Sequence, residues 1–292
     1  MKSSVDLKIA YTSDVHGCDS QYRDFLSLAK EYRADLIIVG GDLFPKKQPT
    51  IQQAIADQHS YLVGTFIPML AEHRRSTGAD ILLLMGNDDV RVHEELFEFT
   101  CAKAGLLTLH EQCHTIKGWQ IFGNSCVTFT PFLLKDWEVY DCISSEELRP
   151  DSVDYRFPGT ILTKDRSDWH RTIAMRLEES ARQILDWSRS IAVIHQPPHG
   201  GILDQLWNGQ FAGSLAVRRF IEQRQPALAF HGHIHESPSK SGRWHERIGR
   251  TCAIQPGQDF VKLHAVTLCT SDIPGSLQHS IFGTAERNRD DR

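Results

Sequence analysis

Histidine is concentrated at one point of the chain, where residues 231–235 read His-Gly-His-Ile-His. They follow directly on an apolar run, residues 227–230, that is typical of a buried strand. An imidazole at the end of such a strand must be hydrogen-bonded, charged or bound to a metal. If the strand continued, His231, His233 and His235 would all lie on one side of it. A solvated, histidine-rich turn is the alternative for this motif taken alone.

Four other strand-like runs end in side chains of the metal-binding type. Ligands of open α/β sheets gather at the carboxyl ends of parallel strands, so we expect these ends to meet at one edge. Each residue taken singly has an ordinary explanation, as a turn former or as a hydrogen-bonded core histidine. Together they place seven oxygen and nitrogen donors on one sheet edge, and the seven are Asp14, His16, Asp42, Asn87, His195, His233 and His235.

This donor set indicates two metal ions. Two carboxylates, one amide oxygen and four imidazoles exceed the four ligands of a tetrahedral zinc site. They suit two divalent ions about 3.5–4 Å apart that share one carboxylate. The mixture of hard oxygen and imidazole nitrogen favours Mn, Fe or Zn over Mg or Ca. Such a pair activates a bridging water and neutralises charge on a phosphoryl group, which predicts a small phosphorylated substrate.

The elements that must position these residues alternate between strand and helix, which predicts βαβ units and a largely parallel sheet. The apolar runs are continuous, as in strands that are covered on both faces. Strands are expected at residues 7–11, 34–39, 80–85, 191–194, 227–230, 251–254 and 261–266.

Capping residues and helix breakers predict where the helices begin and end. Asp19 or Ser20 is expected to cap the first helix, and Thr50 with Gln53 has the spacing of a capping box. Pro68 should kink or restart the helix that Thr50 begins. Further helices are expected over residues 94–104, ending at Gly105, over 173–185, and after Ser214.

We expect residues 1–270 to form a single domain with an irregular insertion at about 127–170. The insertion has no sustained hydrophobic period, and its many aromatic residues either shape a pocket or pack down onto the domain. Residues 271–292 are polar and are expected to be a disordered tail.

The composition of the 292 residues, 40% hydrophobic and 24% charged, is ordinary for a soluble globular protein. A net charge of -5 argues against nucleic acid as a partner. No apolar run approaches the roughly 20 residues of a membrane span, and the start lacks a signal peptide. Seven cysteines without C-x-x-C spacing indicate a reducing compartment. We expect a cytoplasmic protein without a membrane partner, and its oligomeric state stays open.

The motifs and their order resemble those of the calcineurin-like metallophosphoesterases, over most of the chain. The resemblance lies in Asp14-Val15-His16, Gly41-Asp42, Gly86-Asn87, His195 and Gly232-His233-Ile234-His235. It is strongest to the small bacterial phosphoesterases related to Icc, through Gly232 to Ser237 and Gln255-Pro256-Gly257.

This resemblance implies a four-layer α/β/β/α sandwich with mixed sheets and a dinuclear centre at the carboxyl ends of the strands. It implies a phosphatase or phosphodiesterase that cleaves a phosphate mono- or diester with a metal-bridging hydroxide as nucleophile. By similarity, one metal would take Asp14, His16, Asp42 and His235. The second would take Asn87, His195 and His233, with Asp42 shared.

One position departs from the family pattern. After Gly86-Asn87 most members have a histidine that is assigned to protonating the leaving group, and this chain has Asp88. Two dications should lower the pKa of a neighbouring carboxyl group, which makes it a poor general acid at pH 7. Either the enzyme favours esters with good leaving groups, or His199 or His231 supplies the proton. Asp89 either orients Asp88 or caps the following turn.

Two other functions compete with hydrolysis of small phosphoesters. One is a catalytically silent scaffold on the same fold, although a scaffold does not need seven metal-binding side chains. The other is a nuclease, which the acidic balance argues against. Four loop arginines are candidates for binding phosphate, although solvated loop arginines are the commoner case. They are Arg91, Arg243, Arg247 and Arg250.

Overall fold

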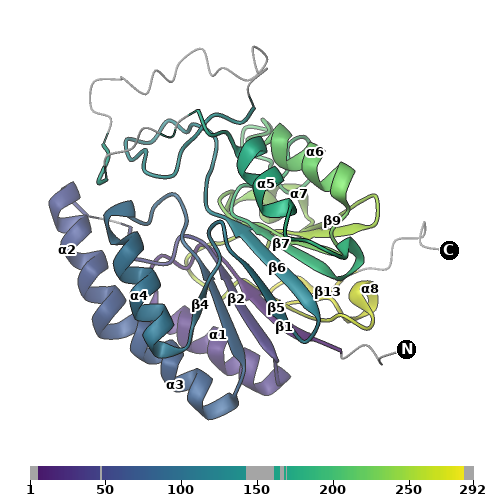
Figure 1. Cartoon of the computed structure of the whole chain (residues 1–292), viewed down its shortest axis with the longest axis horizontal. Helices are drawn as coiled ribbons and strands as arrows, with labels where there is room; N and C mark the ends of the chain where they lie inside the picture. The colour runs from purple at the N-terminus through teal and green to yellow at the C-terminus, as the bar shows by residue number, and fades with distance from the viewer. Residues whose placement is uncertain (1–5, 47, 143–160, 165–167, 169, 286–292) are drawn as a thin grey trace.

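The computed structural model describes residues 6–46, 48–142, 161–164, 168 and 170–285 (Figure 1). Its first sheet is mixed, with the strand order β13-β12-β11-β1-β2-β3-β4. The strands β1 to β4 run parallel to one another, and β11 pairs antiparallel with β1. Their bounds are β1 (Lys8–Thr12), β2 (Leu36–Gly40), β3 (Asp80–Leu84), β4 (Leu107–Thr108), β11 (Ala265–Cys269), β12 (Gln278–His279) and β13 (Gly283–Thr284).

The second sheet is also mixed, with the order β5-β6-β7-β8-β10-β9. Its four central strands are parallel, and β5 and β9 pair antiparallel at its two edges. Periodicity alone predicted a largely parallel sheet, whereas the resemblance implied mixed sheets, and β9 was not predicted. The bounds are β5 (Cys113–Ile116), β6 (Trp119–Asn124), β7 (Ser190–Ile194), β8 (Leu228–Phe230), β9 (His245–Ile248) and β10 (Thr251–Ile254).

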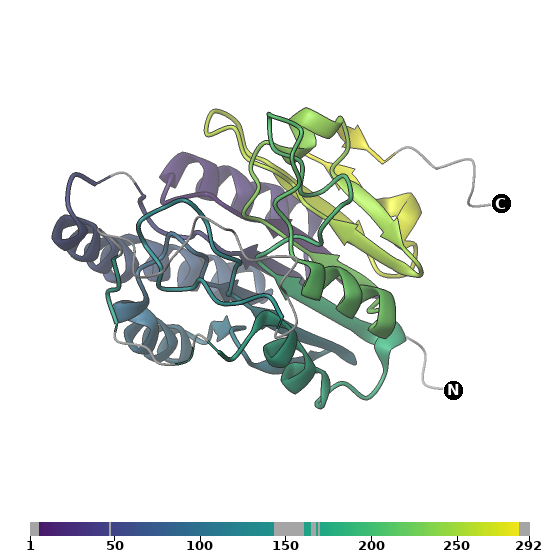
Figure 2. The same ribbon diagram turned by 90° about the horizontal axis from the view of Figure 1, so that it is seen from above.

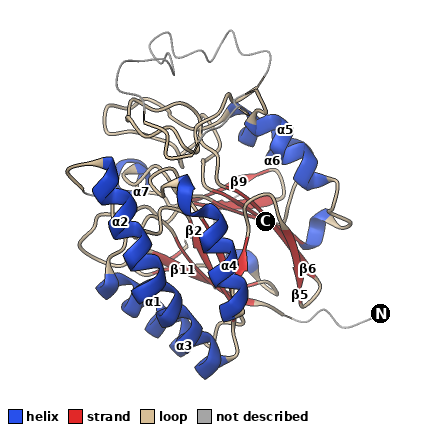
Figure 3. Cartoon of the chain, turned by 60° about the vertical axis from the view of Figure 1, so that its left-hand side comes forward, coloured by secondary structure: helices blue, strands red, loops and turns tan. Residues whose placement is uncertain are grey.

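Helices cover the outer faces of both sheets (Figure 3). The two helical layers lie on the outside, with the two sheets between them (Figure 2). This arrangement confirms the four-layer α/β/β/α sandwich. The helices are α1 (Asp19–Tyr32), α2 (Ile51–Tyr61), α3 (Ile67–Thr77), α4 (Glu94–Ala104), α5 (Ile173–Ala181) and α6 (Leu215–Arg224), with the short α7 (Ser237–Ser241) and α8 (Ile273–Ser276).

The core has two parts because neighbouring residues of a strand point to opposite faces. In β1, Ile9 and Tyr11 belong to the core between the two sheets, whereas Ala10 packs under the helices. In β2, Leu36 and Ile38 face the other sheet, and Ile37 and Val39 face the helices. Both faces of these strands are therefore buried, which explains why their sequences are continuously apolar.

The predicted helix boundaries agree with the structure at most ends. The Thr50 side chain accepts a hydrogen bond from the Gln53 amide at 3.2 Å, and Ser214 caps α6 in the same way. Pro68 lies in the first turn of α3, directly after a π-helical segment over Leu62–Phe66. The prediction for the first helix was wrong, since its N-cap is Cys18 and no side chain caps it.

Residues 271–285 are folded, so the prediction of a disordered tail from residue 271 was wrong for this part. They form α8, β12 and β13 at the edge of the first sheet. Leu277 and Ala285 are buried in the core between the sheets, and the amide of Ala285 donates to the Leu277 carbonyl at 3.1 Å. These two apolar residues pack a mostly polar segment against the core, and the average composition of the segment does not reveal them. Residues 286–292 lie outside the described residues.

Two predicted elements are displaced. The strand expected at 261–266 is β11, which begins only at Ala265 because Val261 is 80% exposed and cannot lie in a covered strand. The helix expected over 173–185 ends at Ala181, and Leu185 is exposed. Within the expected insertion at 127–170, the described parts, 127–142, 161–164, 168 and 170, contain only isolated bridges. Across the described residues, no helix combines the length and apolarity needed to cross a membrane.

Candidate metal centre

The seven predicted donors lie in the loops that directly follow β1, β2, β3, β7 and β8. The structure brings them together from five separate places in the chain. Four of the seven have a left-handed backbone, which non-glycine residues rarely adopt and which is typical of functional sites. These four are Asp14, His16, Asp42 and His233, with φ of 59°, 49°, 51° and 70°.

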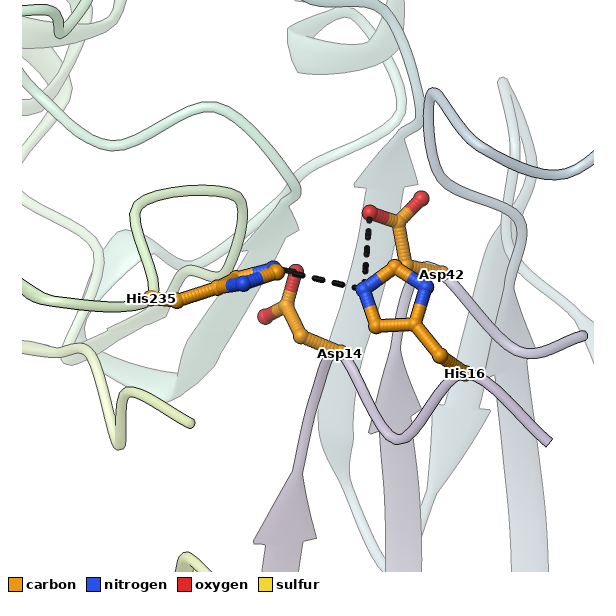
Figure 4. Close-up of side chains that lie close together, drawn as sticks. All are labelled: Asp14, His16, Asp42 and His235. Atoms are coloured by element: carbon orange, nitrogen blue, oxygen red, sulfur yellow. Dashed lines mark hydrogen bonds and ion pairs between the residues drawn. The ribbon is translucent and has the colours of Figure 1, made fainter. Parts of the chain in front are cut away.

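The first group consists of Asp14, His16, Asp42 and His235 (Figure 4). Each of these residues offers one ligand atom, and the four atoms lie within 4.8 Å of one another. The Nε2 atoms of His16 and His235 are 3.3 Å apart. His235 Nε2 is also 3.3 Å from Asp14 Oδ1. Two imidazole nitrogens that face each other beside carboxylates need a proton or a cation between them.

The second group consists of Asn87, His195 and His233. Asn87 Oδ1 lies 2.6 Å from His233 Nδ1 and 3.2 Å from His195 Nε2. Asp42 connects the two groups, since its Oδ2 is 3.7 Å from His16 Nε2 and 3.6 Å from His195 Nε2. The cluster thus has two halves with one carboxylate between them.

The buried polar atoms of the cluster fit cation binding. Asp14 Oδ2 is buried and has no hydrogen-bond partner among the described residues. A buried carboxylate oxygen without a partner is costly unless a cation satisfies it. The ring of His195 is fully buried, and its Nδ1 donates to the Gly40 carbonyl at 2.9 Å. This bond turns Nε2 of His195 toward the cluster, as outer hydrogen bonds do for metal-binding histidines.

The protonation states within the cluster follow from burial and charge. Burial lowers the pKa of His16 to about 4 and that of His233 to about 3, so both rings are neutral near pH 7. Neutral imidazole is the form that binds a metal. Burial also disfavours the charge on His195, but the carboxylates of Asp42 and Asp14 outweigh it and raise its pKa to about 9. The carboxylates that raise this pKa are the same groups that would attract a cation.

Three glycines let the backbone pass close to these side chains. A Cβ atom on Gly86 would lie 2.3 Å from both the amide nitrogen and Oδ1 of Asp42. One on Gly41, whose φ is +121°, would lie 2.2 Å from His195 Nδ1. One on Gly232 would lie 2.6 Å from Asp14 Oδ2. The glycines of the motifs are therefore needed for space, since any side chain would displace a donor.

Asp88 lies at the edge of the cluster, and its Oδ2 is 2.6 Å from Lys46 Nζ. Its amide donates to Asp42 Oδ1 at 2.8 Å. Burial, together with the charge of Asp42, raises the pKa of Asp88 to about 7. The sequence had predicted a lowered pKa, on the premise of two bound dications. The sequence analysis did not identify Lys46. The one local indication is that a basic residue stands in the loop that follows Asp42.

Asp89 ties two loops together. Its carboxylate accepts hydrogen bonds from the amides of Leu43, Phe44 and Gly86 at 2.8–2.9 Å. These bonds link the loop after β2 to the loop after β3. All three donors are main-chain amides. Asp89 therefore fixes the backbone of these two loops relative to each other.

His199 and His231 have partners outside the set of seven donors. His199 Nδ1 is 3.5 Å from Asp204 Oδ2, and its ring packs against Phe211. His231 is fully buried, and its Nδ1 donates to the Ile194 carbonyl at 2.9 Å. β8 ends at Phe230, so the alternation that would have placed His231 beside His233 does not continue.

A pocket of about 270 Å³ opens beside the cluster. Neither His199 nor His231 is among the described residues that line it, and none of the four candidate arginines is. Arg91 instead pairs with Glu94 at 3.1 Å. Its lining combines cluster residues and Asp88 with apolar side chains such as Phe129, Phe132 and Leu206. The lining residues are Asp42, Lys46, Asn87, Asp88, Thr128, Phe129, Thr130, Pro131, Phe132, Leu206, Ala212, His233, Ile234, His235 and Glu236.

Comparison with known proteins agrees with this geometry. The sequence model of the calcineurin-like phosphoesterases matches residues 7–237. No curated protein sequence gives a match. One solved crystal structure superposes with a TM-score of 0.66 at 15% identity, covering 96% of this chain and 100% of its own. The crystal structure of TT1561 of Thermus thermophilus superposes with a TM-score of 0.59 at 16% identity, covering 95% and 100%.

At these identities the solved structures show a shared fold. The match to the family's sequence model is stronger evidence of kinship, because it spans most of the chain and includes all five motifs at the strand ends. The resemblance read from the sequence is thereby confirmed, and the chain belongs to the calcineurin-like phosphoesterase family.

Proposed function

We propose that this protein is a phosphoesterase that binds two divalent metal ions in the cluster. One ion would be held by Asp14, His16, Asp42 and His235, and the other by Asp42, Asn87, His195 and His233. The observation that carries the proposal is the position of Asp42, whose Oδ2 lies 3.7 Å from His16 Nε2 and 3.6 Å from His195 Nε2. A carboxylate between two sets of donors is what a shared ligand requires.

The donor set supports Mn, Fe or Zn, because it mixes imidazole with carboxylate and amide oxygen. When bound, the two cations would supply a water of lowered pKa as nucleophile and neutralise the charge that develops on the phosphoryl group. The protein's own part is to hold the donors rigidly. It does so through Asp89, through the Gly40 carbonyl behind His195, and through Gln255, whose side chain donates to the Gly232 carbonyl at 2.6 Å.

The substrate side of the site supports a small phosphorylated molecule, either a monoester or a diester. A pocket of about 270 Å³ is close to the lower limit for small-molecule sites. Lys46 lies on its wall and offers a cation to the phosphate. The positions of His199 and His231 argue against either as proton donor, which leaves the hypothesis that the enzyme favours esters with good leaving groups.

The test is to strip the protein of metal and to reload it with Mn²⁺, Fe²⁺ or Zn²⁺. We expect about two ions per chain and hydrolysis of chromogenic mono- or diesters only after reloading. Asp42→Asn is the matched variant, because it keeps the size of the side chain and removes the shared charge. Full hydrolysis by the stripped protein would contradict the proposal. Little bound metal and no hydrolysis with any ion would instead favour the catalytically silent scaffold.

A further inference from the structure

Part of the pocket wall consists of aromatic rings. Phe129 and Phe132 both line it, and the Phe132 side chain is 52% exposed. An exposed phenylalanine beside a polar cluster loses hydrophobic free energy unless a ligand covers it. Lys46 Nζ lies 5.2 Å from the centre of the Phe132 ring, so the ring and the cation face the same space.

This wall is held rigidly from behind by a buried polar network. Lys135 and Glu138 are nearly inaccessible and form an ion pair at 2.8 Å. Glu138 Oε2 accepts a hydrogen bond from the Thr130 amide at 3.0 Å, and Lys135 Nζ donates to the Thr130 carbonyl at 2.6 Å. The hydroxyl of Thr130 in turn accepts from the Phe132 amide at 3.2 Å. A fully satisfied buried network fixes a conformation, so Phe132 is presented on a preorganised loop.

The pocket offers no imidazole beyond the two cluster histidines among its described lining residues. At the position after Asn87 stands Asp88, a carboxylate that is paired with Lys46. A departing oxygen beside Asp88 would meet the Lys46 ammonium. Such a site is suited to a leaving group that departs as an anion. An aromatic alcohol meets this requirement, because a phenol has a pKa of about 10, whereas water has a pKa of about 15.7.

We infer that the substrate is a small aryl phosphoester, with its ring packed on Phe132 and its leaving oxygen facing Lys46. This inference rests on the proposed function. In the step, the oxygen of one water molecule forms a bond to phosphorus and the bond from phosphorus to the aryl oxygen breaks. The electron pair of that bond leaves on the aryl oxygen as phenolate, and the proton released by the water passes to solvent.

The test compares ligands that cannot be hydrolysed on the full chain loaded with Mn²⁺. Phenylphosphonate and cyclohexylphosphonate have the same charge and similar size, but only the first is planar and aromatic. We expect phenylphosphonate to bind about 3- to 10-fold more tightly by calorimetry, since stacking on an aromatic ring favours it. Phe132→Leu should abolish this preference, so that the two ligands bind this variant within about twofold of each other.

Phe99→Leu is the matched control. Phe99 is 56% exposed on α4, and Lys103 Nζ lies 4.3 Å from the centre of its ring, yet it does not line the pocket. This variant should retain the full preference for phenylphosphonate. Both substitutions are at exposed positions, and a thermal melt of each variant is the test that it is folded.

Binding of methylphosphonate distinguishes a failure of the proposed function from a failure of the proposed aryl specificity. If it fails to bind and no phosphoester is hydrolysed, the proposed function itself is wrong. If methylphosphonate binds but phenyl and cyclohexyl ligands bind equally, the protein is a phosphoesterase and the aryl specificity alone is overturned. A preference for phenylphosphonate that survives in Phe132→Leu would also overturn the assignment of Phe132.

Discussion

The ammonium of Lys46 lies 2.6 Å from the carboxylate of Asp88, at the edge of the candidate metal cluster. The family's usual histidine would present a neutral or singly charged ring at the position of Asp88. Here the two side chains form an ion pair that fixes Lys46 over the pocket. On the proposed function, this pair would place a cation, instead of a proton-donating ring, beside a departing anion.

Replacing Lys46 by Met keeps most of the stem and removes the charge. We expect kcat/KM for a phosphoester to fall about 10²-fold, the cost of losing one preorganised charge-stabilising group. Lys46→Arg should recover part of the loss. Steady-state kinetics on the metal-loaded protein measure both effects. An unchanged kcat/KM in Lys46→Met would show that this cation does not contact the substrate.

Asp88→His tests whether the enzyme depends on its leaving group. The wild type should show a steep decline of rate as the pKa of the leaving alcohol rises, because no imidazole protonates the departing oxygen. The histidine variant should flatten that dependence across a series of substituted phenyl esters. If Asp88→Ala changes neither the rate nor the dependence, Asp88 has no role in the reaction.

Single substitutions in the cluster should remove different numbers of metal ions. His235→Ala removes a donor of the first group, and His233→Ala removes one of the second, so each is expected to lose about one ion per chain. Asp42→Ala should lose both, because both groups include it. Elemental analysis after dialysis gives the count. Equal losses from all three variants would contradict a shared carboxylate.

The convergence of the seven donors could be predicted because each donor directly follows an apolar run, and parallel strands end on one edge. The division into two sheets could not be derived from periodicity, since the strands of both sheets are covered on both faces and have the same apolar pattern. The different partners of His231 and His233 could not be predicted from alternation along a strand either. They depend on β8 ending at Phe230 and on the Gly232 backbone turning into the cluster.

Contacts that depend on the tertiary structure also could not be predicted from the sequence. Lys46 and Asp88 lie 42 positions apart, and nothing local to either residue indicates their pairing. Lys135 and Glu138 have the spacing of an ordinary exposed pair, yet they are buried behind the aromatic wall. The docking of Leu277 and Ala285 likewise depends on a hydrophobic core that is built mostly from earlier residues.

Gly86→Ala tests the close approach of the backbone to Asp42. A Cβ atom 2.3 Å from the Asp42 amide must displace backbone, so we expect a loss of about 1–3 kcal/mol in stability and weaker metal binding. Gly64→Ala is the control, since no atom lies within 4 Å of the added Cβ. In its helical setting it should stabilise the protein by roughly 0.5–1 kcal/mol. Urea denaturation of both variants measures the difference, and equal effects would refute the steric argument.

The largely buried ring of His110, whose side chain is 11% exposed, should make the stability of the metal-stripped protein depend on pH. Burial lowers its pKa to about 4, and the ring accepts a hydrogen bond from the Ser125 amide at 3.1 Å and packs on Trp137. In the unfolded chain the same ring binds a proton with its ordinary pKa of 6.5, so between these values the unfolded state holds more protons than the folded state. Stability is therefore fully present above pH 6.5 and is lost as the pH falls toward 4.

Between pH 7 and pH 5 this one residue should cost about 2 kcal/mol of unfolding free energy. His110→Gln, which keeps an acceptor for the Ser125 amide but does not titrate, should reduce the pH dependence by that amount. His59→Gln, a substitution on the exposed side of α2, should not. Urea titrations of the stripped proteins across this range provide the measurement. A variant whose stability falls as steeply as that of the wild type would show that His110 is protonated in the folded state.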